Sequence, residues 1–189
     1  MTRRLLGLLC ASALLAALSA RVGAESAVEQ FYKGNQLRLI GSAGPGSGYS
    51  AWTRFIGQHL GRHLPGAPAV VVQYMGGAGG LIAANYMYSL AGRDGREIAA
   101  LSREAPALAL IGTPGVRYDP LRFSWLGSPT SETNVCFVDR DAPVRTVQDL
   151  RSRELLLGTD GVGSGMHIYP TVLNALVNTR FKVIDSYGM

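Results

Sequence analysis

The chain has 189 residues, of which 47% are apolar and 16% are charged, and its formal net charge is +5 at pH 7. This composition allows a packed core and excludes a chain that is disordered throughout. The positive charge does not indicate nucleic-acid binding, because Lys and Arg form no run and three arginines (Arg3, Arg4 and Arg21) lie in the first 24 residues. Without those three, the net charge falls from +5 to +2.

Residues 1–24 predict a signal peptide. Arg3 and Arg4 precede the apolar stretch "LLGLLCASALLAALSA", and the small residues of "VGA" offer a cleavage site before Glu25. The alternative is a membrane anchor, but the apolar stretch is shorter than the ~20 residues that usually span a bilayer. We therefore expect an exported, periplasmic protein. Only Cys136 then remains, which excludes an intramolecular disulfide and a zinc cluster built on cysteines.

Three segments repeat one order of elements, in which a β-rich run leads into a glycine-rich turn and then an amphipathic run of helical period. They are "QLRLI", "GSAGPGSGYS" and "AWTRFIGQHLGRHL" from residue 36, "AVVVQ", "YMGGAGG" and "LIAANYMYSLAG" from residue 69, and "ELLLG", "TDGVGSG" and "MHIYPTVLNALV" from residue 154. In the first helix, Trp52, Phe55, Ile56 and Leu60 fall near one face. Strands that alternate with helices predict an α/β fold with a mostly parallel sheet.

The remaining elements follow the same reasoning. We expect a strand over 96–102, a short helix over 105–112, two strands over 124–130 and 133–141, and a short helix near 150 that Thr146 caps. The run "NVCFV" predicts that Cys136 is buried and inert. The composition changes near 104, so we expect one lobe over 25–104 and a second over 105–189. The last strand, "FKVI", has no helix after it, so we expect the second lobe to be incomplete.

The glycine-rich turns do not match a nucleotide loop. The first two lack the Lys of a phosphate loop, and "GPGSGY" has the wrong spacing for a dinucleotide fingerprint. Three such turns at the carboxyl ends of strands instead predict a ligand crevice rich in backbone N–H groups, which attract carboxylates. Seven hydroxyl side chains add neutral donors there: Ser42, Ser47, Ser50, Ser102, Ser128, Thr159 and Ser164. The predicted function is a receptor for a small organic acid that needs no cofactor.

Two alternative interpretations give histidine side chains a chemical role, one in catalysis and one in metal binding. Ser164 and His167 would be the reacting pair of a secreted α/β hydrolase or transferase, although no G-x-S-x-G turn and no orienting acid stand beside them. His59 and His63 lie four residues apart on the first helix, as metal ligands often do, but no Glu accompanies them. We therefore expect no catalytic residue and no metal site.

The sequence resembles the periplasmic solute-binding proteins of the tripartite tricarboxylate transporter family, also called Bug receptors. The resemblance runs from about Phe31 to the last residue and is carried by motifs in combination: "FYKGNQLRLI", "GPGSGYSAWTRFIGQHLGRHLPG", "VVVQYMGGAGGLIAANYMY", "VRYDPLRFSWLGS", "NVCFV", "APVRTVQDL" and "LLLGTDGVGSG". It implies a two-lobed flytrap of the type II periplasmic-binding-protein kind. Such a receptor captures a carboxylate, delivers it to membrane transporter subunits, and is a monomer when full length. A sensor that feeds a signalling partner is an alternative.

The resemblance also implies a ligand site. By position it comprises Ala43, Gly44, Pro45, Gly46, Ser47, Gly48, Ser50, Ser128, Thr159, Asp160, Gly161, Gly163 and Ser164, with Gly127 and Ser128 at a strand end. The glycines of "GGAGG" are a family hallmark expected to shape the lobe. Two departures affect the ligand, because the family usually has a bulky aromatic residue where Ala43 stands and an acid where Ser50 stands. The family chain also continues beyond a pair like Tyr187-Gly188, which again implies an incomplete second lobe.

Overall fold

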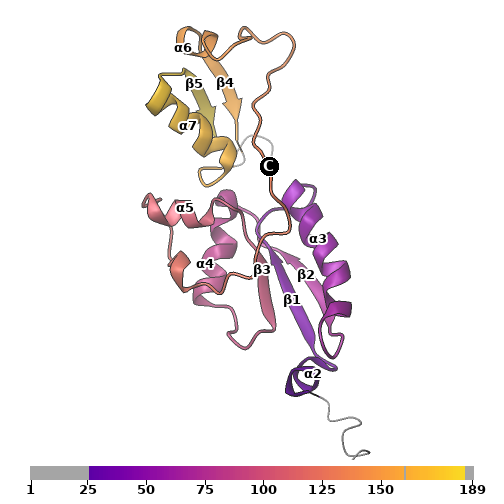
Figure 1. Ribbon diagram of the computed structural model, residues 1–189. Coiled ribbons are helices and arrows are strands. Elements are labelled where there is room, and N and C mark those ends of the chain that lie inside the picture. The colour runs from indigo at the N-terminus through magenta and orange to yellow at the C-terminus, as the bar shows by residue number, and fades with distance from the viewer. Residues whose placement is uncertain (1–25, 160, 186–189) are drawn as a thin grey trace, which may run out of the picture.

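The computed structural model describes residues 26–159 and 161–185. They form a mixed α/β structure of two bodies, one above the other in Figure 1, each built around a small parallel sheet. The expected signal peptide (1–24), Asp160 and the Tyr187-Gly188 pair lie outside the described residues. Within those ranges, no helix has the length and apolar character needed to cross a membrane.

The first body contains a three-stranded sheet in the order β2-β1-β3. The strands are β1 (Gln36–Gly41), β2 (Ala69–Tyr74) and β3 (Glu97–Ala100), and all of them run parallel. Leu39 of β1 pairs with Val72 of β2 and with Ile98 of β3. The central strand is also the most buried, with Leu37, Leu39 and Ile40 at most 2% exposed. The predicted parallel α/β arrangement is therefore confirmed for this part of the chain.

Helices cover both faces of this sheet (Figure 1). Helix α3 (Gly48–Leu60), followed by the turn η1 (Gly61–His63), lies on one side, and α4 (Leu81–Ser89) and α5 (Ala105–Leu110) lie on the other. Helix α2 (Ala27–Tyr32) precedes β1, and the short turns η2 (Ala78–Gly80) and η3 (Pro120–Arg122) flank the α4–α5 side. A cluster of Ala84, Ala105 and Tyr118 forms the core there, with Phe123 packed against it. The packing of the first body thus extends to Phe123, while the expected domain boundary at 104 stays a prediction.

Helix α3 does not bury the apolar face that its sequence suggests. Its buried residues are Ser50, Thr53 and Gly57, whereas Trp52 and Phe55 are 41% and 53% exposed. The reason is close packing, since a Cβ added at Gly57 would come within 2.5 Å of Val72 Cγ2. Small side chains let the helix lie directly on the sheet, and the large ones are left outside.

The second body is smaller. Strands β4 (Leu155–Gly158) and β5 (Phe181–Ile184) are parallel and are joined by α7 (Gly165–Val177). Its core contains Val144, Leu150 and Phe181, with Leu155 and Val183 packed against them. Helix α6 (Asp149–Ser152) supplies Leu150. The predicted cap is not at the helix start, because α6 begins at Asp149 and its N-cap residue is Gln148, which makes no side-chain cap hydrogen bond. Thr146 instead closes the turn before the helix: its Oγ1 accepts a hydrogen bond from Asp149 N–H at 3.2 Å, and Asp149 Oδ2 accepts one from Thr146 N–H at 2.9 Å.

The segment 124–141 joins the two bodies as an extended stretch (Figure 1). The prediction of two strands here is wrong, because none of these residues is in a strand. The prediction that Cys136 is buried is also wrong, since Cys136 is exposed and Phe137 is 87% exposed. A β-rich sequence becomes a strand only when a neighbouring strand pairs with its backbone, and none of the described strands pairs with this segment.

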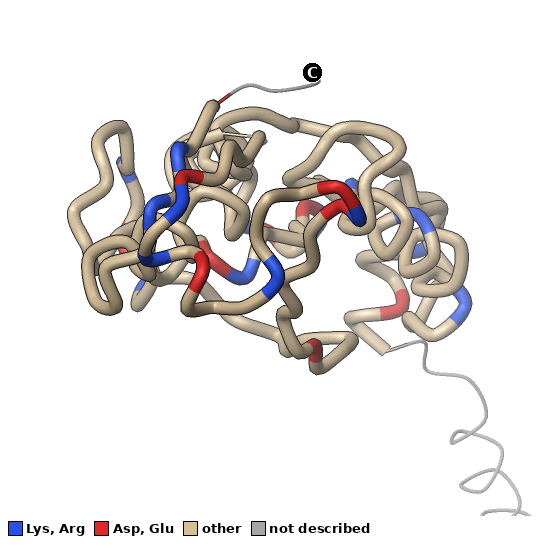
Figure 2. Tube along the Cα trace, turned by 90° about the horizontal axis from the view of Figure 1, so that it is seen from above, with Lys and Arg blue, Asp and Glu red and all other residues tan. Residues whose placement is uncertain are grey.

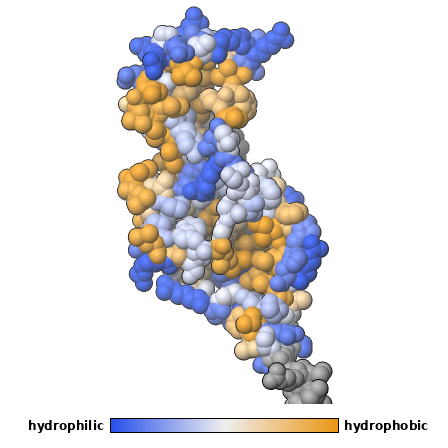
Figure 3. All heavy atoms as spheres, in the orientation of Figure 1, coloured by the Kyte–Doolittle hydropathy of each residue, from blue (hydrophilic) through white to orange (hydrophobic). Residues whose placement is uncertain are grey.

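The surface carries both charge signs and several apolar side chains. Figure 2 shows Lys and Arg interspersed with Asp and Glu along the trace. In Figure 3 the two bodies meet at a narrower waist, and apolar residues reach the surface on both. Leu156 and Leu176 of the second body are 61% and 76% exposed. The second body therefore keeps apolar surface that its own elements do not cover.

Candidate functional site

The carboxyl ends of the three strands in the first body bring their turns together. Met75 N–H donates to Gly41 O at 2.8 Å, and Ser42 N–H donates to Ala100 O at 3.1 Å. The turns after β1, β2 and β3 therefore start side by side. A Cβ added at Gly76 would lie 2.8 Å from the backbone nitrogen of Gly44, so the first two glycine-rich turns are in contact.

The third glycine-rich turn, from the second body, lies against the second one. A Cβ added at Gly79, whose φ is +62°, would overlap the backbone of Gly163 and Ser164. A Cβ added at Gly163 would lie 2.5 Å from Ala78 O. Backbone thus packs directly on backbone where the two bodies meet. The turn "GGAGG" therefore lies between the two turns that the resemblance assigns to the ligand. Its glycines were predicted to shape the lobe and were not placed in the ligand site.

The first turn leads into the N-terminus of α3. Ser47 Oγ accepts a hydrogen bond from Ser50 N–H at 3.1 Å and donates one to Gly44 O at 3.0 Å. Ser50 is fully buried, and its hydroxyl donates to Ser47 O at 2.8 Å. Gly46 has a φ of +95°, a conformation that side chains with a Cβ disfavour. The other predicted residues of this turn, Ala43, Pro45 and Gly48, are partly or fully exposed. Ser50 therefore contributes to the helix cap and not to the surface of the turn.

The turn of the second body is buried and internally bonded. Thr159 Oγ1 accepts a hydrogen bond from Gly161 N–H at 3.2 Å and donates one to Asp185 Oδ1 at 2.9 Å. Ser164 caps α7, since its Oγ accepts a hydrogen bond from the backbone N–H of His167 at 3.3 Å. Thr159 and Ser164 are 1% and 6% exposed. Both hydroxyl groups already hold the turn in shape.

His167 has an acidic partner that the sequence did not indicate. Its Nδ1 lies 2.6 Å from Asp185 Oδ1. This hydrogen bond, followed by the one from Thr159, lowers the pKa of Asp185 below its ordinary value. A serine nucleophile would donate its hydroxyl hydrogen to the imidazole, but among the described contacts Ser164 Oγ bonds only to the backbone of His167. The pair His167–Asp185 is thus assembled without the hydrogen bond that would activate Ser164.

Ser42 and Ser102 differ from the other hydroxyl groups because nothing bonds to them. They are 2% and 8% exposed, and neither Oγ has a hydrogen-bond partner among the described residues. Both flank Gly80, where an added Cβ would lie 3.2 Å from Ser42 Cβ and 3.3 Å from Ser102 Cβ. A buried hydroxyl without a partner costs free energy, so these two groups are candidates for bonding to a ligand.

A charged cluster follows Ser102 in sequence, a few residues after the end of β3. Glu104 is 8% exposed; its Oε1 accepts a hydrogen bond from Arg103 Nε at 3.0 Å, and its Oε2 accepts one from Tyr49 Oη at 3.3 Å. Burial raises the pKa of Tyr49, and the hydrogen bond to Glu104 raises the pKa of Arg103. Sequence reasoning missed this cluster. The available signal was an Arg-Glu pair close after an apolar strand.

Glu104 also reaches the second body. A Cβ added at Gly165, the first residue of α7, would lie 2.9 Å from Glu104 Oε1. A carboxylate from the first body thus lies beside the N-terminus of the helix that follows the third turn. The N-terminal end of a helix carries partial positive charge, so this position favours an anion.

Ser128 is not brought to the site. It lies in the exposed segment 124–141, and its hydroxyl donates to Thr130 O at 2.7 Å. The expectation that Gly127 and Ser128 stand at the end of a strand is wrong, because no strand is present there. His59 packs against Phe55, with ring centroids 4.6 Å apart. Among the described residues, no group of three or more His, Cys, Asp or Glu is placed to hold a metal ion.

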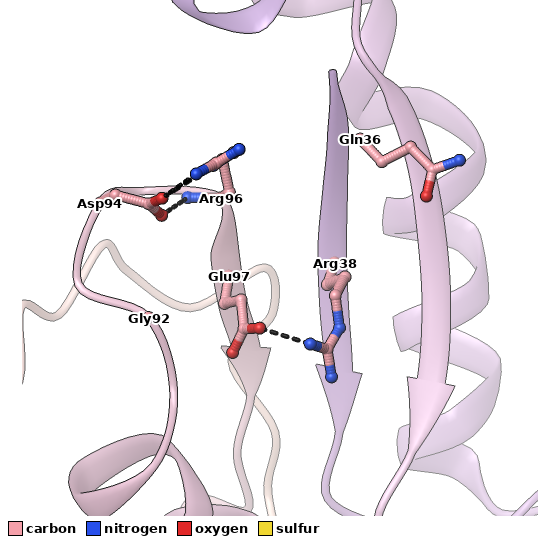
Figure 4. Close-up of a pocket in the computed structure, with 6 residues that line it drawn as sticks. All are labelled: Gln36, Arg38, Gly92, Asp94, Arg96 and Glu97. Carbon is pink, nitrogen blue, oxygen red and sulfur yellow. Dashed lines mark hydrogen bonds and ion pairs between the residues drawn. The ribbon is translucent and has the colours of Figure 1, made fainter.

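A separate pocket of about 240 Å³ opens at the amino ends of β1 and β3 (Figure 4). Its charged side chains pair with one another, Arg38 with Glu97 at 2.5 Å and Arg96 with Asp94 at 2.6 Å. Arg38 also donates to Gln73 Oε1 at 2.9 Å. The pocket lies at the opposite end of the sheet from the glycine-rich turns. Because its charges neutralise each other, we regard the carboxyl end of the sheet as the stronger candidate site.

No protein-family model matches this sequence, and a comparison with curated proteins gives no match. The resemblance to Bug receptors therefore depends on the motifs quoted above, and it remains a prediction.

Proposed function

We propose that this chain belongs to an exported receptor that captures a small organic acid between two lobes and delivers it to a membrane transporter of the tripartite tricarboxylate type. In this proposal the two α/β bodies are the lobes of a flytrap, and the segment 124–141 is a connection between them. The protein is not an enzyme and works in the periplasm. Its partners are the ligand and the transporter subunits.

One observation carries the proposal. Glycine-rich turns from both bodies meet at one place, and two buried hydroxyl groups without partners, those of Ser42 and Ser102, lie beside that contact. Turns of this kind expose backbone N–H groups, and hydroxyl groups add neutral donors, a combination that suits a carboxylate. Glu104, a carboxylate of the protein itself, lies at the start of α7 in the same region. Glu104 therefore satisfies the positive end of α7 itself, and the proposed ligand would bond to the turns and hydroxyl groups of the first body.

A second candidate function is hydrolysis or group transfer by Ser164 and His167. The observation that favours it is the short hydrogen bond between His167 and Asp185, which would orient the imidazole as an acid does in known triads. The two functions are separable by reaction with an activated ester probe followed by mass spectrometry. Labelling of Ser164 in the native protein would favour the enzyme. An unlabelled Ser164 together with binding of organic acids would favour the receptor.

Thermal-shift measurements with a panel of mono-, di- and tricarboxylates test the receptor proposal. A ligand at about 100 times its Kd stabilises the folded state by about 2.7 kcal/mol. We expect stabilisation by at least one organic acid, and we expect Ser42→Ala and Ser102→Ala to weaken it. Ser89→Ala, at the exposed end of α4, is the matched control and should behave as the wild type. Stabilisation by ATP or NAD alone would overturn the proposal.

A further inference from the structure

The solvent-facing side of α3 carries aromatic side chains around an apolar hollow. Because small residues of this helix pack on the sheet, Trp52 and Phe55 are 41% and 53% exposed. Their rings meet edge to face, with centroids 5.9 Å apart, and together with Ala51 they line a hollow of about 290 Å³. Helix α3 lies at the outer edge of the first body (Figure 1). The hollow is therefore open to an apolar side chain of another molecule.

Arginine lies on the same side of the helix. Arg62 follows Phe55 by seven residues, which is about two helical turns, so the two lie on one line along α3 and η1. Arg54 flanks this line, and both arginines are exposed. Among the described residues, neither arginine forms an ion pair. Arg62 Nε donates to His63 Nε2 at 3.3 Å, a contact that leaves its charge without a counterion.

The sequence around α3 contains basic residues but no acidic ones. Residues 30–93 include no Asp or Glu, although the whole chain has 13 of them. The positive charge of Arg54 and Arg62 is therefore not offset by an acidic neighbour on the same helix or on the two strands that precede and follow it. A surface of this kind is complementary to one that carries carboxylates.

We propose that this surface, formed by Ala51, Trp52, Arg54, Phe55 and Arg62, docks an acidic surface of another protein. An apolar side chain of the partner fills the hollow, and carboxylates of the partner lie opposite the two arginines. Aromatic residues and arginine are enriched at protein interfaces and among the residues that dominate binding energy. The surface and its test do not depend on the ligand proposed above; within the proposed receptor function, the partner is a transporter subunit.

An anionic membrane is the competing partner, because aromatic rings and basic side chains also suit the surface of a bilayer. Segments that recognise anionic lipids usually carry clusters of about 4–8 Lys or Arg. On this surface only Arg54 and Arg62 accompany the aromatic rings, and the apolar side chains line a hollow. A hollow accepts a protruding side chain, whereas a bilayer offers none, so the geometry favours a protein partner.

The test selects binders to the purified chain from a phage-displayed library of random peptides. We expect the selected peptides to combine Asp and Glu with a central apolar residue. Fluorescence anisotropy then measures the Kd of a labelled selected peptide. Phe55→Ser and Arg62→Glu should each weaken its binding by about 10-fold or more. A version of the peptide with Lys in place of its acidic residues should bind Arg62→Glu more tightly than the wild type, because the charges are then complementary again.

The matched controls are Leu176→Ser on α7 and Arg151→Glu on α6, which change an exposed apolar and an exposed basic residue of the second body. Both should leave the Kd unchanged. All four positions are exposed, so the variants should keep the wild-type far-UV spectrum.

The proposal is overturned by any of three results. The first is a selection that gives no enrichment of acidic peptides. The second is a selected peptide that binds Phe55→Ser and Arg62→Glu as tightly as the two controls, because it would then bind elsewhere on the chain. The third is binding to phosphatidylglycerol vesicles that Arg62→Glu abolishes, in a chain that selects no acidic peptide; the surface would then bind a membrane.

Discussion

Removing an unpartnered buried hydroxyl group should stabilise the ligand-free protein while it weakens binding. Ser42 is 2% exposed, and its Oγ has no hydrogen-bond partner among the described residues. Leaving a buried polar group unpaired costs about 1–3 kcal/mol, so Ser42→Ala relieves that cost and leaves a gap of only one atom. Allowing for lost packing, we expect a gain of about 1 kcal/mol, which corresponds to about 2–4 °C in Tm for a chain of this length.

Ser50→Ala is the matched control for this prediction. Ser50 is also fully buried, but its hydroxyl donates to Ser47 O at 2.8 Å. The same chemical change should therefore lower the free energy of unfolding by about 1 kcal/mol. Differential scanning calorimetry without ligand measures both variants. A loss of stability in Ser42→Ala equal to that in Ser50→Ala would show that Ser42 has a structural partner, and the argument for a ligand-facing hydroxyl group would fail.

Three further predictions concern other contacts. Gly79→Val should separate the two bodies, because the added side chain would meet the backbone of the third turn at Gly163 and Ser164. Small-angle scattering should then show a larger radius of gyration, and an unchanged radius would contradict the contact. Asp185 has a lowered pKa because of its hydrogen bond to His167, so its stabilising effect is fully present above about pH 4, the ordinary pKa of an aspartate, and is lost as the pH falls through the lowered pKa. Urea melts of Asp185→Asn should differ from the wild type at pH 6, and the difference should shrink steadily as the pH is lowered below about 4; a difference independent of pH would contradict the contact. Glu97→Gln should lower the free energy of unfolding in urea by about 1–2 kcal/mol. This loss is smaller than for a fully buried ion pair because the side chain of Arg38 is 39% exposed, and no loss would mean that the pair does not form in solution.

Much of the first body was predictable from local sequence. The expected strands over 36–40 and 69–73 correspond to β1 (Gln36–Gly41) and β2 (Ala69–Tyr74). In each case an apolar β-rich run ends at a glycine-rich turn, and a helix begins within a few residues. The contact of Thr146 just before α6 was predictable for the same reason, since its hydrogen bonds join residues three apart, although the helix itself begins at Asp149. Such signals depend on near neighbours in the chain, which the sequence contains directly.

The wrong predictions concern contacts between distant residues. Residues 133–141 have the composition of a strand, but a strand requires a partner, and the sequence does not contain that information. The orientation of α3 failed differently, because apolar content favoured burial of Trp52 and Phe55. The close approach of Gly57 to Val72 decided the packing instead. The cluster of Tyr49 and Glu104 was missed because 55 residues separate the two side chains in sequence.

The candidate site needs both bodies. The unpartnered hydroxyl groups of Ser42 and Ser102 belong to the first body, while the buried start of α7 at Ser164 belongs to the second. The two are brought together by contacts in which backbone meets backbone, at Gly79 and Gly163. The side chains of Leu108 and Glu104 from the first body also lie against the third turn, near Gly163 and Gly165. A ligand that bonds to groups on both sides would add its own contacts to those between the bodies, and that differential stabilisation of the closed arrangement is the physical requirement for a receptor whose lobes close when the ligand binds.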